Sequence, residues 1–459
     1  MDQTDPSLAR PPAAPAHDPD LILAPLESLG IRLQIGRVER LLESFDSPQD
    51  SYATVLVAGT NGKGSTAALL ASMVAAAGYR TGLFTSPHLE GVEERLRRDG
   101  LAISRGDLGE LLQEIVQRAE SVGLEPPTYF EALTVAACLW FARSGVDLAV
   151  FEVGMGGRLD ATNCCSPQLA LVSEIGFDHV KALGDTLTEI ACEKAGIFRP
   201  GVTAICAASE SEARNALESC ARSIGAKYRH VSDWFDSPHV AVQGAVVQQV
   251  RVVSAMSDYK LDLGLPGQHQ VRNLLLALAG AEHLSVSGWP DLDREAIERG
   301  VRTCSWPGRL ERVELPGGKV LWLDVAHNPQ GAETLSRFLA AQLPEYDLLL
   351  GILADKDARG ILAALAPGAT RIVLTRPASE RALDPVVLSE ALVERRAEVE
   401  PDPSAALVRS LEGRRPLLVC GSLYLVGSVR LTLREMFGIP PPPVNLTATA
   451  AADLARNQA

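Results

Sequence analysis

The sequence lacks the features that mark secreted, membrane-spanning and nucleic-acid-binding proteins. Its eight cysteines include no C-x-x-C pair, which argues against a zinc ribbon or thioredoxin-type site and favours reduced cytosolic thiols. No apolar run is long enough to cross a bilayer, and residues 1–20 lack the basic and apolar regions of a signal peptide. The net charge is −14, from 43 Lys+Arg against 57 Asp+Glu, which argues against a broad nucleic-acid-binding surface. We therefore expect a cytoplasmic protein with no nucleic-acid or membrane partner.

What is present is ordinary globular material, with 46% hydrophobic and 22% charged residues in a chain of 459. That length suggests two to four domains. The Pro/Ala-rich residues 1–20 and the Pro-rich residues 439–459 are predicted to be disordered tails. Between them we expect an N-terminal domain at 21–304, a linker at 305–309 (Ser-Trp-Pro-Gly-Arg) and a C-terminal domain at 310–438.

Apolar runs typical of strands alternate with helix-forming runs along both predicted domains. In the first domain the expected strands are 54–58, 80–84, 147–153 and 169–175, and the expected helices are 66–77, 129–143, 186–195 and 271–281. Residues 232–265 predict a small β-meander, and 320–325, 347–353, 370–375 and 416–420 predict strands of the second domain. The fold class is therefore α/β: a large, P-loop-type, doubly wound domain with a mostly parallel sheet, then a smaller Rossmann-like domain.

The strongest local signal is the glycine-rich loop between the strand at 54–58 and the helix that follows. It reads Gly59, Thr60, Asn61, Gly62, Lys63, Gly64, Ser65. Glycines let backbone N–H groups face phosphate oxygens, and the helix N-terminus adds a positive dipole. Gly64 separates Lys63 from Ser65, so the loop is not a strict G-x-x-x-x-G-K-[ST] motif, and a plain strand-to-helix turn is the alternative. We predict phosphate binding, with Lys63 reaching the β- and γ-phosphates.

Polar residues that follow other strands are expected to converge with this loop, because ligands bind beyond the carboxyl ends of parallel strands. Glu152 ends a nearly all-apolar strand, where a carboxylate is costly to bury unless it binds a cation such as Mg²⁺. His179 follows another strand and is a second candidate ligand for the same ion. Each of the two residues, taken alone, also fits a purely structural role. By residue type, Lys194 is only a surface lysine at a helix end. Residues 324–329 (Asp-Val-Ala-His-Asn-Pro) are either a capped turn or polar groups facing a cleft.

Taken in order, these segments resemble the folylpolyglutamate synthase/dihydrofolate synthase family, a branch of the Mur ligase superfamily. The resemblance covers residues 21–437, nearly the whole chain. The motifs that carry it are AGTNGKGS at 58–65, TSPHL at 85–89, ER at 94–95, TYFE at 128–131, EVGMGGRLDATN at 152–163, IGFDH at 175–179, LGDT at 183–186, EKAGI at 193–197, PGR at 307–309, DVAHNP at 324–329 and GSLY at 421–424.

The resemblance implies an ATP-dependent amide ligase whose substrates are ATP, L-glutamate and a folate or dihydropteroate. The substrate carboxylate attacks the γ-phosphate, and the amine of glutamate then attacks the acyl phosphate. Such chemistry needs positioning and charge neutralisation more than a protein nucleophile. A monomer that uses two Mg²⁺ ions is expected.

The resemblance also assigns roles to individual residues. Lys63 would stabilise the transferred group, and Ser86, Glu152 and His179 match the family's Mg²⁺ ligands. Lys194 matches a carbamylated lysine that holds the second metal, because a carbamate is an anion formed from a neutral amine. The residues that match nucleotide contacts are Asn273, Arg309 and Asp324, and those on the second-domain side of the active cleft are His327 and Ser422.

The matching substrate positions are Thr128, Tyr129, Phe130 and Glu131, together with Asp160, Ala161 and Thr162. An aromatic face from Tyr129 or Phe130 would suit a pterin ring, and core packing is the alternative. Two departures from the family pattern stand out. Residues 33–37 (Leu-Gln-Ile-Gly-Arg) replace a Leu-Gly-Leu-Glu/Asp-Arg segment that helps to hold dihydropteroate, and Val325 replaces a glycine.

Four alternatives are considered. The chain could be a monofunctional folylpolyglutamate synthase, or a cell-wall type ligase acting on a nucleotide-sugar carboxylate. A nucleotide-binding switch would leave Lys194 and residues 128–131 without a role, and the guanine-reading Asn-Lys-x-Asp motif is missing from the sequence. An inactive homologue is disfavoured because every proposed metal and phosphate ligand is present in kind.

Overall fold

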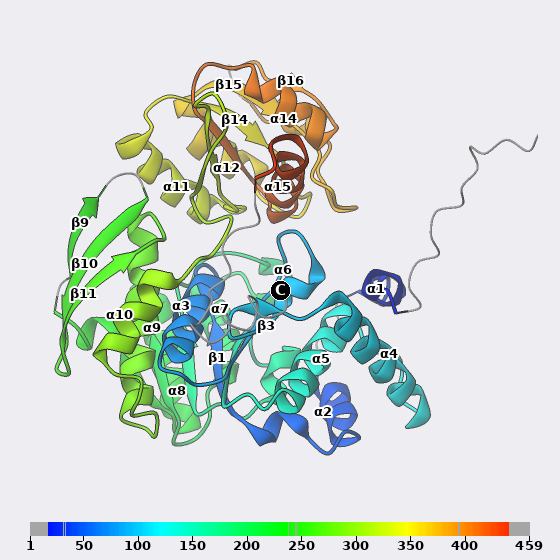
Figure 1. Ribbon diagram of the computed structural model, residues 1–459, viewed down its shortest axis with the longest axis vertical. Coiled ribbons are helices and arrows are strands. Elements are labelled where there is room, and N and C mark those ends of the chain that lie inside the picture. Colours follow the sequence, from blue (N-terminus) through cyan, green and yellow to red (C-terminus); the bar gives the residue numbers. More distant parts are fainter. Residues whose placement is uncertain are drawn as a thin grey trace, which may run out of the picture.

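The computed structural model describes residues 17–30, 32, 34–236, 238–243, 246–392 and 395–439. Residues 1–16 and 440–459, and with them most of the two predicted tails, lie outside the described residues, as does Leu33. The first helix, α1 (Pro19–Glu27), begins two residues inside the predicted N-terminal tail, with Asp18 as its N-cap. Figure 1 shows the second α/β unit stacked above the larger first one, which confirms the predicted fold class.

The first unit is built on an eight-stranded sheet of order β4-β3-β2-β5-β1-β6-β7-β8. Its strands are β1 (Ala53–Ala58), β2 (Thr81–Phe84), β3 (Leu96–Arg98), β4 (Leu101–Ala102), β5 (Leu148–Glu152), β6 (Leu169–Val172), β7 (Thr203–Cys206) and β8 (Lys227–His230). Strands β2, β5, β1, β6, β7 and β8 run parallel to one another, while β3 and β4 form an antiparallel edge beside β2. The central strand β1 pairs with β5 and β6, so the residues that follow these three strands meet at one edge.

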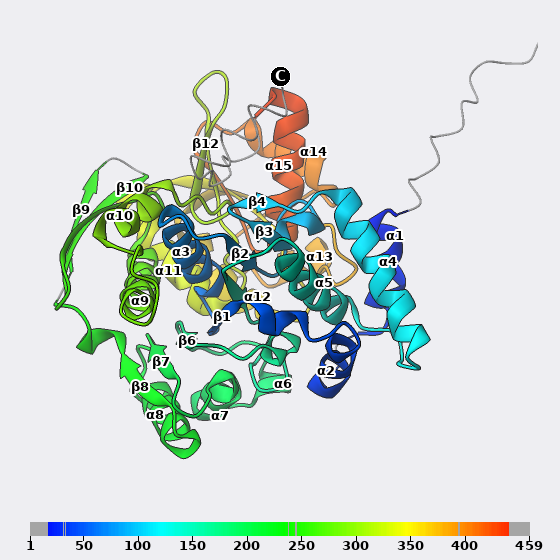
Figure 2. The same cartoon turned by 60° about the horizontal axis from the view of Figure 1, so that its bottom comes forward.

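Helices cover both faces of this sheet, because side chains alternate along each strand. Leu56 and Ala58 of β1 pack into one core, and Val55 and Val57 pack into the other. The first core is covered by α1, α2 (Ile35–Glu43), α4 (Arg105–Ser121), α5 (Tyr129–Arg143), α7 (Leu187–Lys194) and α8 (Ser211–Ile224). The second is covered by α3 (Lys63–Ala76), α9 (Gln268–Ser285) and α10 (Arg294–Thr303), as Figure 2 shows.

The predicted meander is confirmed as a three-stranded antiparallel sheet of order β11-β10-β9. Its strands are β9 (His239–Gln243), β10 (Val247–Val253) and β11 (Asp258–Leu263). β10 alternates buried and exposed residues along its length, as expected for a sheet with one face on the core. Val250 and Val252 extend the second core beyond the large sheet.

The second unit has a six-stranded sheet of order β12-β13-β17-β14-β15-β16, parallel except for β12. Its strands are β12 (Glu311–Glu314), β13 (Val320–Leu323), β14 (Tyr346–Leu350), β15 (Ala369–Leu374), β16 (Glu398–Val399) and β17 (Leu417–Cys420). α11 (Pro329–Gln342), α12 (Ala358–Leu365) and α13 (Pro385–Glu390) pack on one face, and α14 (Pro403–Leu411) and α15 (Leu423–Phe437) on the other.

Helix α15 also joins the two units. Arg430 and Arg434 each place a guanidinium nitrogen 2.6 Å from the carboxylate of Glu90, which lies in the loop after β2. The helix approaches this loop closely at Gly427, where an added Cβ would lie 1.9 Å from the carbonyl oxygen of Leu89. Glycine at this position is therefore what allows the two units to touch.

The predicted elements missed several short strands. β3, β4, β7, β8, β12 and β16 were not predicted, and most of them lie at sheet edges. β8 carries Lys227 and Arg229, whose side chains point to solvent, so it has none of the apolar signal that marks a buried strand. Within the described part of the chain, no helix is both long enough and apolar enough to cross a bilayer.

Candidate active site

A cavity of about 1220 Å³ lies between the two units, at the carboxyl ends of the central strands of both sheets. Nearly all of the residues predicted to act in catalysis or binding line it. They are Gly59, Thr60, Asn61, Gly62, Lys63, Gly64, Ser65, Ser86, Thr128, Tyr129, Phe130, Glu131, Glu152, Asp160, Ala161, His179, Lys194, Asn273, Arg309, Asp324, His327 and Ser422. Thr162 is the one predicted residue that does not line the cavity, and its side chain is fully buried.

The glycine-rich loop leads directly from β1 into α3. Gly62 adopts a left-handed conformation with φ of 91° and is the N-cap of α3, with no side chain capping the helix. The first N–H groups of α3 are therefore available to an anionic ligand. Asn273 packs against Gly62 so closely that an added Cβ would lie 2.2 Å from its amide oxygen. The Lys63 ammonium curls back and donates to the carbonyl of Thr60 at 3.1 Å.

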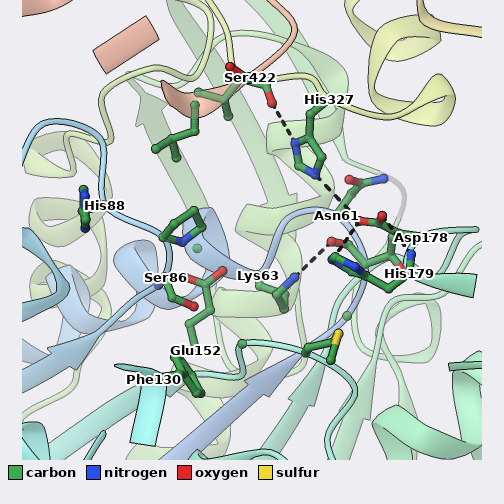
Figure 3. A pocket seen from close by; sticks show the side chains of 18 of the residues that line it. Asn61, Lys63, Ser86, His88, Phe130, Glu152, Asp178, His179, His327 and Ser422 are labelled. Carbon is green, nitrogen blue, oxygen red and sulfur yellow. Dashed lines mark hydrogen bonds and ion pairs between the residues drawn. The ribbon is translucent and has the colours of Figure 1, made fainter. Parts of the chain in front are cut away.

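Glu152 ends β5 with its side chain only 6% exposed. Its carboxylate accepts a hydrogen bond from the backbone N–H of Ser86 at 3.0 Å, and both residues lie on the same side of Lys63 in Figure 3. Burial raises the pKa of Glu152, although the positive charges of Lys63 and Arg309 oppose this. A buried carboxylate beside a hydroxyl is a donor set that suits Mg²⁺, so these two residues fit the predicted ion.

A second cluster forms around Asp178, on the other side of Lys63 (Figure 3). Its carboxylate accepts a hydrogen bond from the ammonium of Lys356 at 2.7 Å, and it lies 3.7 Å from Nε2 of His327 and 3.9 Å from Nε2 of His179. Burial alone would raise the pKa of Asp178, but its contact with His327 and the charges of His179 and Lys356 hold it well below its usual value. Asp178 therefore joins the two units through one carboxylate.

Lys194 is not the surface lysine that its residue type suggests. It is the last residue of α7, its side chain is 4% exposed, and its ammonium donates to the carbonyl of Gly59 at 2.8 Å. Burial, together with the charge of Lys63, lowers the pKa of Lys194 to about 7. A substantial fraction of Lys194 is therefore the neutral amine at neutral pH, and the neutral amine is the form that can react with carbon dioxide.

The second unit reaches the glycine-rich loop through amide side chains. Asn61 donates to Oε1 of Gln330 at 2.7 Å and accepts from Nδ2 of Asn328 at 3.1 Å. Asn328 is also the N-cap of α11, so its position is set by that helix. Asp324 accepts from the backbone N–H groups of Leu310 and Ala326, which makes it part of a capped turn as well as a cavity residue.

The predicted aromatic positions differ in their surroundings. Phe130 lies 5.8 Å from Phe84, ring centre to ring centre, and covers Gly154, where an added Cβ would lie 2.6 Å from its ring. Tyr129 lies beneath the guanidinium of Arg95, which is 5.1 Å from its ring centre. Each ring is partly buried and also lines the cavity.

Thr128 and Glu131 have structural partners that the sequence did not reveal. They form a capping box at the start of α5: Thr128 accepts from the backbone N–H of Glu131, and Glu131 accepts from that of Thr128. Glu131 also receives two hydrogen bonds from the guanidinium of Arg37, at 2.6 and 2.7 Å. The side chains of Glu131 and Arg37 are only 4% and 8% exposed, respectively. Thr128 and Glu131 are therefore held by structural contacts as well as lining the cavity, and their part in substrate binding stays a prediction.

Three further predicted residues are held by local hydrogen bonds. Asp160 accepts from the hydroxyl and backbone N–H of Thr162 and from the N–H of Met155, which shapes the turn η3 (Ala161–Cys164). Ser422 is the N-cap of α15 and accepts from the N–H of Leu425. Their contribution to ligand binding stays a prediction.

Sequence reasoning missed several residues that line the cavity. Asp178 and Lys356 carry its main interdomain ion pair, and Arg95 pairs with His88 through a 3.0 Å hydrogen bond. Burial and the charge of Arg95 lower the pKa of His88 to about 3, so the imidazole accepts this bond while neutral. Asp178, His88 and Arg95 stand in the motifs at 175–179, 85–89 and 94–95, which could have singled them out, whereas Lys356 stands in none of these motifs.

Comparison with known proteins identifies the family. The Mur ligase middle domain matches residues 57–281, and the Mur ligase glutamate ligase domain matches residues 308–423. The dihydrofolate synthase/folylpolyglutamate synthase of Mycobacterium tuberculosis is 37% identical over 78% of this chain and 77% of its own length. A probable bifunctional folylpolyglutamate synthase/dihydropteroate synthase of Haloferax volcanii is 36% identical over 86% of this chain, which spans only 48% of that longer protein.

Solved structures agree with the sequence matches. The structure of Mycobacterium tuberculosis folylpolyglutamate synthase complexed with ADP and AMPPCP is 33% identical, with a TM-score of 0.82 over 92% of this chain and 100% of that one. The agreement covers both units. The chain therefore belongs to the dihydrofolate synthase/folylpolyglutamate synthase family, and it is an ATP-dependent ligase.

Proposed function

We propose that the cavity joins L-glutamate to the carboxylate of a folate, and also to that of dihydropteroate, with release of ADP and phosphate. The observation that carries this proposal is the convergence of an uncapped helix N-terminus, a buried carboxylate and a buried lysine in one interdomain cavity. Solved relatives support the choice of ligands. One bifunctional synthase was solved with Mn, AMPPNP and L-glutamate, and the FolC protein of E. coli with DHPP and ADP.

In this proposal the glycine-rich loop holds the phosphates of ATP. The N–H groups at the start of α3 and the ammonium of Lys63 offset negative charge as it moves to the leaving ADP. Lys63 is free to turn outward, because within the described part of the chain its ammonium makes a single hydrogen bond, to the carbonyl of Thr60. Asn273 of α9 packs against Gly62 of this loop, and Arg309 of the interdomain connection lines the same cavity, so both would contact the nucleotide.

Ser86, Glu152 and His179 are proposed to hold Mg²⁺, which would supply positive charge next to the phosphates when bound. In this structure Ser86 and Glu152 lie on one side of Lys63 and His179 on the other, so the ion would draw the two groups together (Figure 3). Burial, despite the opposing charge of Asp178, lowers the pKa of His179, so its imidazole is available as a neutral donor at ordinary pH. Asp178 turns His179 and His327 toward the same region by contacting both Nε2 atoms. A second ion, held by a carbamate on Lys194, is part of the proposal.

The carbamate on Lys194 can be tested directly. Replacing Lys194 with alanine is expected to lower turnover strongly with little loss of folding, since the ammonium makes one hydrogen bond to a loop carbonyl. Partial rescue by a short carboxylic acid in the buffer would support the need for an anion at this position. Near-normal turnover by a well-folded variant would contradict the assignment.

Dihydropteroate would occupy the part of the cavity bordered by Tyr129, Phe130 and Asp160. The departure at residues 33–37 bears on this reaction, because Gln34 lines the cavity and Arg37 is buried against Glu131. The arginine of that segment, Arg37, therefore has a defined structural place. A monofunctional folylpolyglutamate synthase is the alternative.

The deciding experiment measures ADP formation by the purified protein with Mg-ATP and L-glutamate. Dihydropteroate is supplied in one reaction and tetrahydrofolate in another, and omission of glutamate is the control. Turnover in both, dependent on glutamate, is the expected result. Turnover with tetrahydrofolate alone would restrict the proposal to polyglutamylation, and silence in both would redirect it to another carboxylate of the superfamily, such as a nucleotide sugar. The protein is proposed to act as a monomer in the cytoplasm.

A further inference from the structure

Three cysteine thiols meet behind the turn η3, outside the cavity described above. Cys138 lies on α5, Cys164 is the last residue of η3, and Cys165 follows it. Their Sγ atoms all lie within 4.8 Å of one another, and those of Cys164 and Cys165 are 4.0 Å apart. Sulfur ligands at about 2.3 Å from a tetrahedral Zn²⁺ lie roughly 3.8 Å from each other, so the trio is close to the spacing of such a centre.

A fourth polar atom faces the three thiols. The Tyr52 side chain precedes β1 and is only 9% exposed, and its phenol oxygen is buried. This oxygen lies against the thiol of Cys138, which is a weak hydrogen-bonding group. The phenol oxygen therefore lies beside the trio, where a fourth ligand to a tetrahedral ion would be needed.

A positive charge lies beside the trio and would balance a metal complex. The Arg199 guanidinium donates to the backbone and side-chain oxygens of Asn163, at 3.0 and 2.8 Å, and its charge acts on Cys165 and Cys164. Three thiolates and one divalent ion carry a net charge of −1, which the guanidinium offsets. Three sulfur donors exclude Mg²⁺ and Ca²⁺, which prefer oxygen.

We propose that Cys138, Cys164 and Cys165 bind one thiophilic ion, Zn²⁺, with the phenol oxygen of Tyr52 completing a tetrahedral site. Binding exchanges three thiol protons for the ion, so three protons are released per Zn²⁺. Cys164 is partly exposed and offers the entry path, while the other two thiols are buried. The site would tie α5 to η3, the turn that contains Ala161 and Thr162, without using any residue of the cavity's metal set.

The test is a titration of the reduced, untagged full-length chain with Co²⁺, followed by displacement with Zn²⁺. A background variant with Cys192→Ser and Cys220→Ser is used, because those two thiols lie 3.0 Å apart at the surface and could compete. One equivalent of Co²⁺ with thiolate charge-transfer absorption, displaced by Zn²⁺, is the expected result. Cys138→Ser and Cys165→Ser are each expected to abolish this absorption, and Tyr52→Phe to shift the visible Co²⁺ bands.

Cys206→Ser is the matched control, because Cys206 is a fully buried thiol of the same domain and is not part of the trio. It should retain the absorption. If the serine variants fail to fold, Cys138→Ala tests the same loss with a smaller polar change. Absent thiolate absorption, absorption retained without Cys138, or loss of two thiols to a disulfide in place of metal binding would each overturn the proposal.

Discussion

Replacing Glu131 with alanine is expected to destabilise the first unit more than it weakens substrate binding. The change leaves the buried guanidinium of Arg37 without its two 2.6–2.7 Å hydrogen bonds and removes the acceptor for the N–H of Thr128. Breaking a buried ion pair from one side costs about 3–5 kcal/mol, and losing the cap adds about 1 kcal/mol. At 2–4 °C per kcal/mol for a domain of this size, Tm should fall by roughly 8 °C or more.

Thermal unfolding followed by circular dichroism measures this effect. Glu125→Ala is the matched control, because Glu125 also faces Arg37, at 3.5 Å, but its side chain is 73% exposed. That variant should change the free energy of unfolding by less than about 1 kcal/mol. An Arg37→Met/Glu131→Leu double variant should recover much of the lost stability, because it leaves no unpaired buried charge.

Steady-state kinetics on the same variants separate the two roles of Glu131. A structural role predicts that KM for the folate changes little when measured well below Tm. An unchanged Tm for Glu131→Ala together with a large rise in KM would refute the reasoning and return Glu131 to the set of substrate ligands.

Three further outcomes follow from the structure. Lys356→Met should lower kcat/KM by roughly 10- to 150-fold, the equivalent of about 1.5–3 kcal/mol for a charged hydrogen bond, and in an Asp178→Asn background it should add little. Gly427→Ala should lower activity while leaving far-ultraviolet circular dichroism unchanged, because its methyl would meet the carbonyl of Leu89 although alanine favours the helix. Burial, with the charges of Arg272 and Arg309, lowers the pKa of His269 to about 4 in the folded state. In the unfolded chain a histidine has a pKa of about 6.5, so it takes up a proton below that pH while the folded protein does not. Stability from this residue is complete above that pH and is lost on acidification; His269→Gln should remove about 2 kcal/mol of the destabilisation measured near pH 5.

Local sequence was sufficient where a single segment carries both the structure and the chemistry. The glycine-rich loop needs a strand, glycines and a helix start in direct succession, so the strand was predicted to within one residue, while the helix begins at Lys63, three residues before its predicted start. Glu152 was recognisable because a carboxylate closes an apolar strand, and it is indeed buried. The meander was recognisable from alternating side chains.

Contacts between residues far apart in the chain decided how the other site residues are buried and paired. Lys194 looks like an ordinary helix-end lysine until the fold buries it against the carbonyl of Gly59, which is 135 residues away in the chain. Glu131 suggested a ligand site because its partner, Arg37, lies on another helix. No local pattern records such pairings.

From sequence alone came the alternation of the main strands and helices, the phosphate loop and the family, because these depend on short-range periodicity and on motifs in a set order. The short strands β3, β4, β7, β8, β12 and β16 did not follow from it. Tertiary structure alone decided which charges are buried, which are paired and which face the cavity. The physical reason is that burial and pairing depend on elements brought together from across the chain: Asp178 meets Lys356 only when the second unit packs on the first.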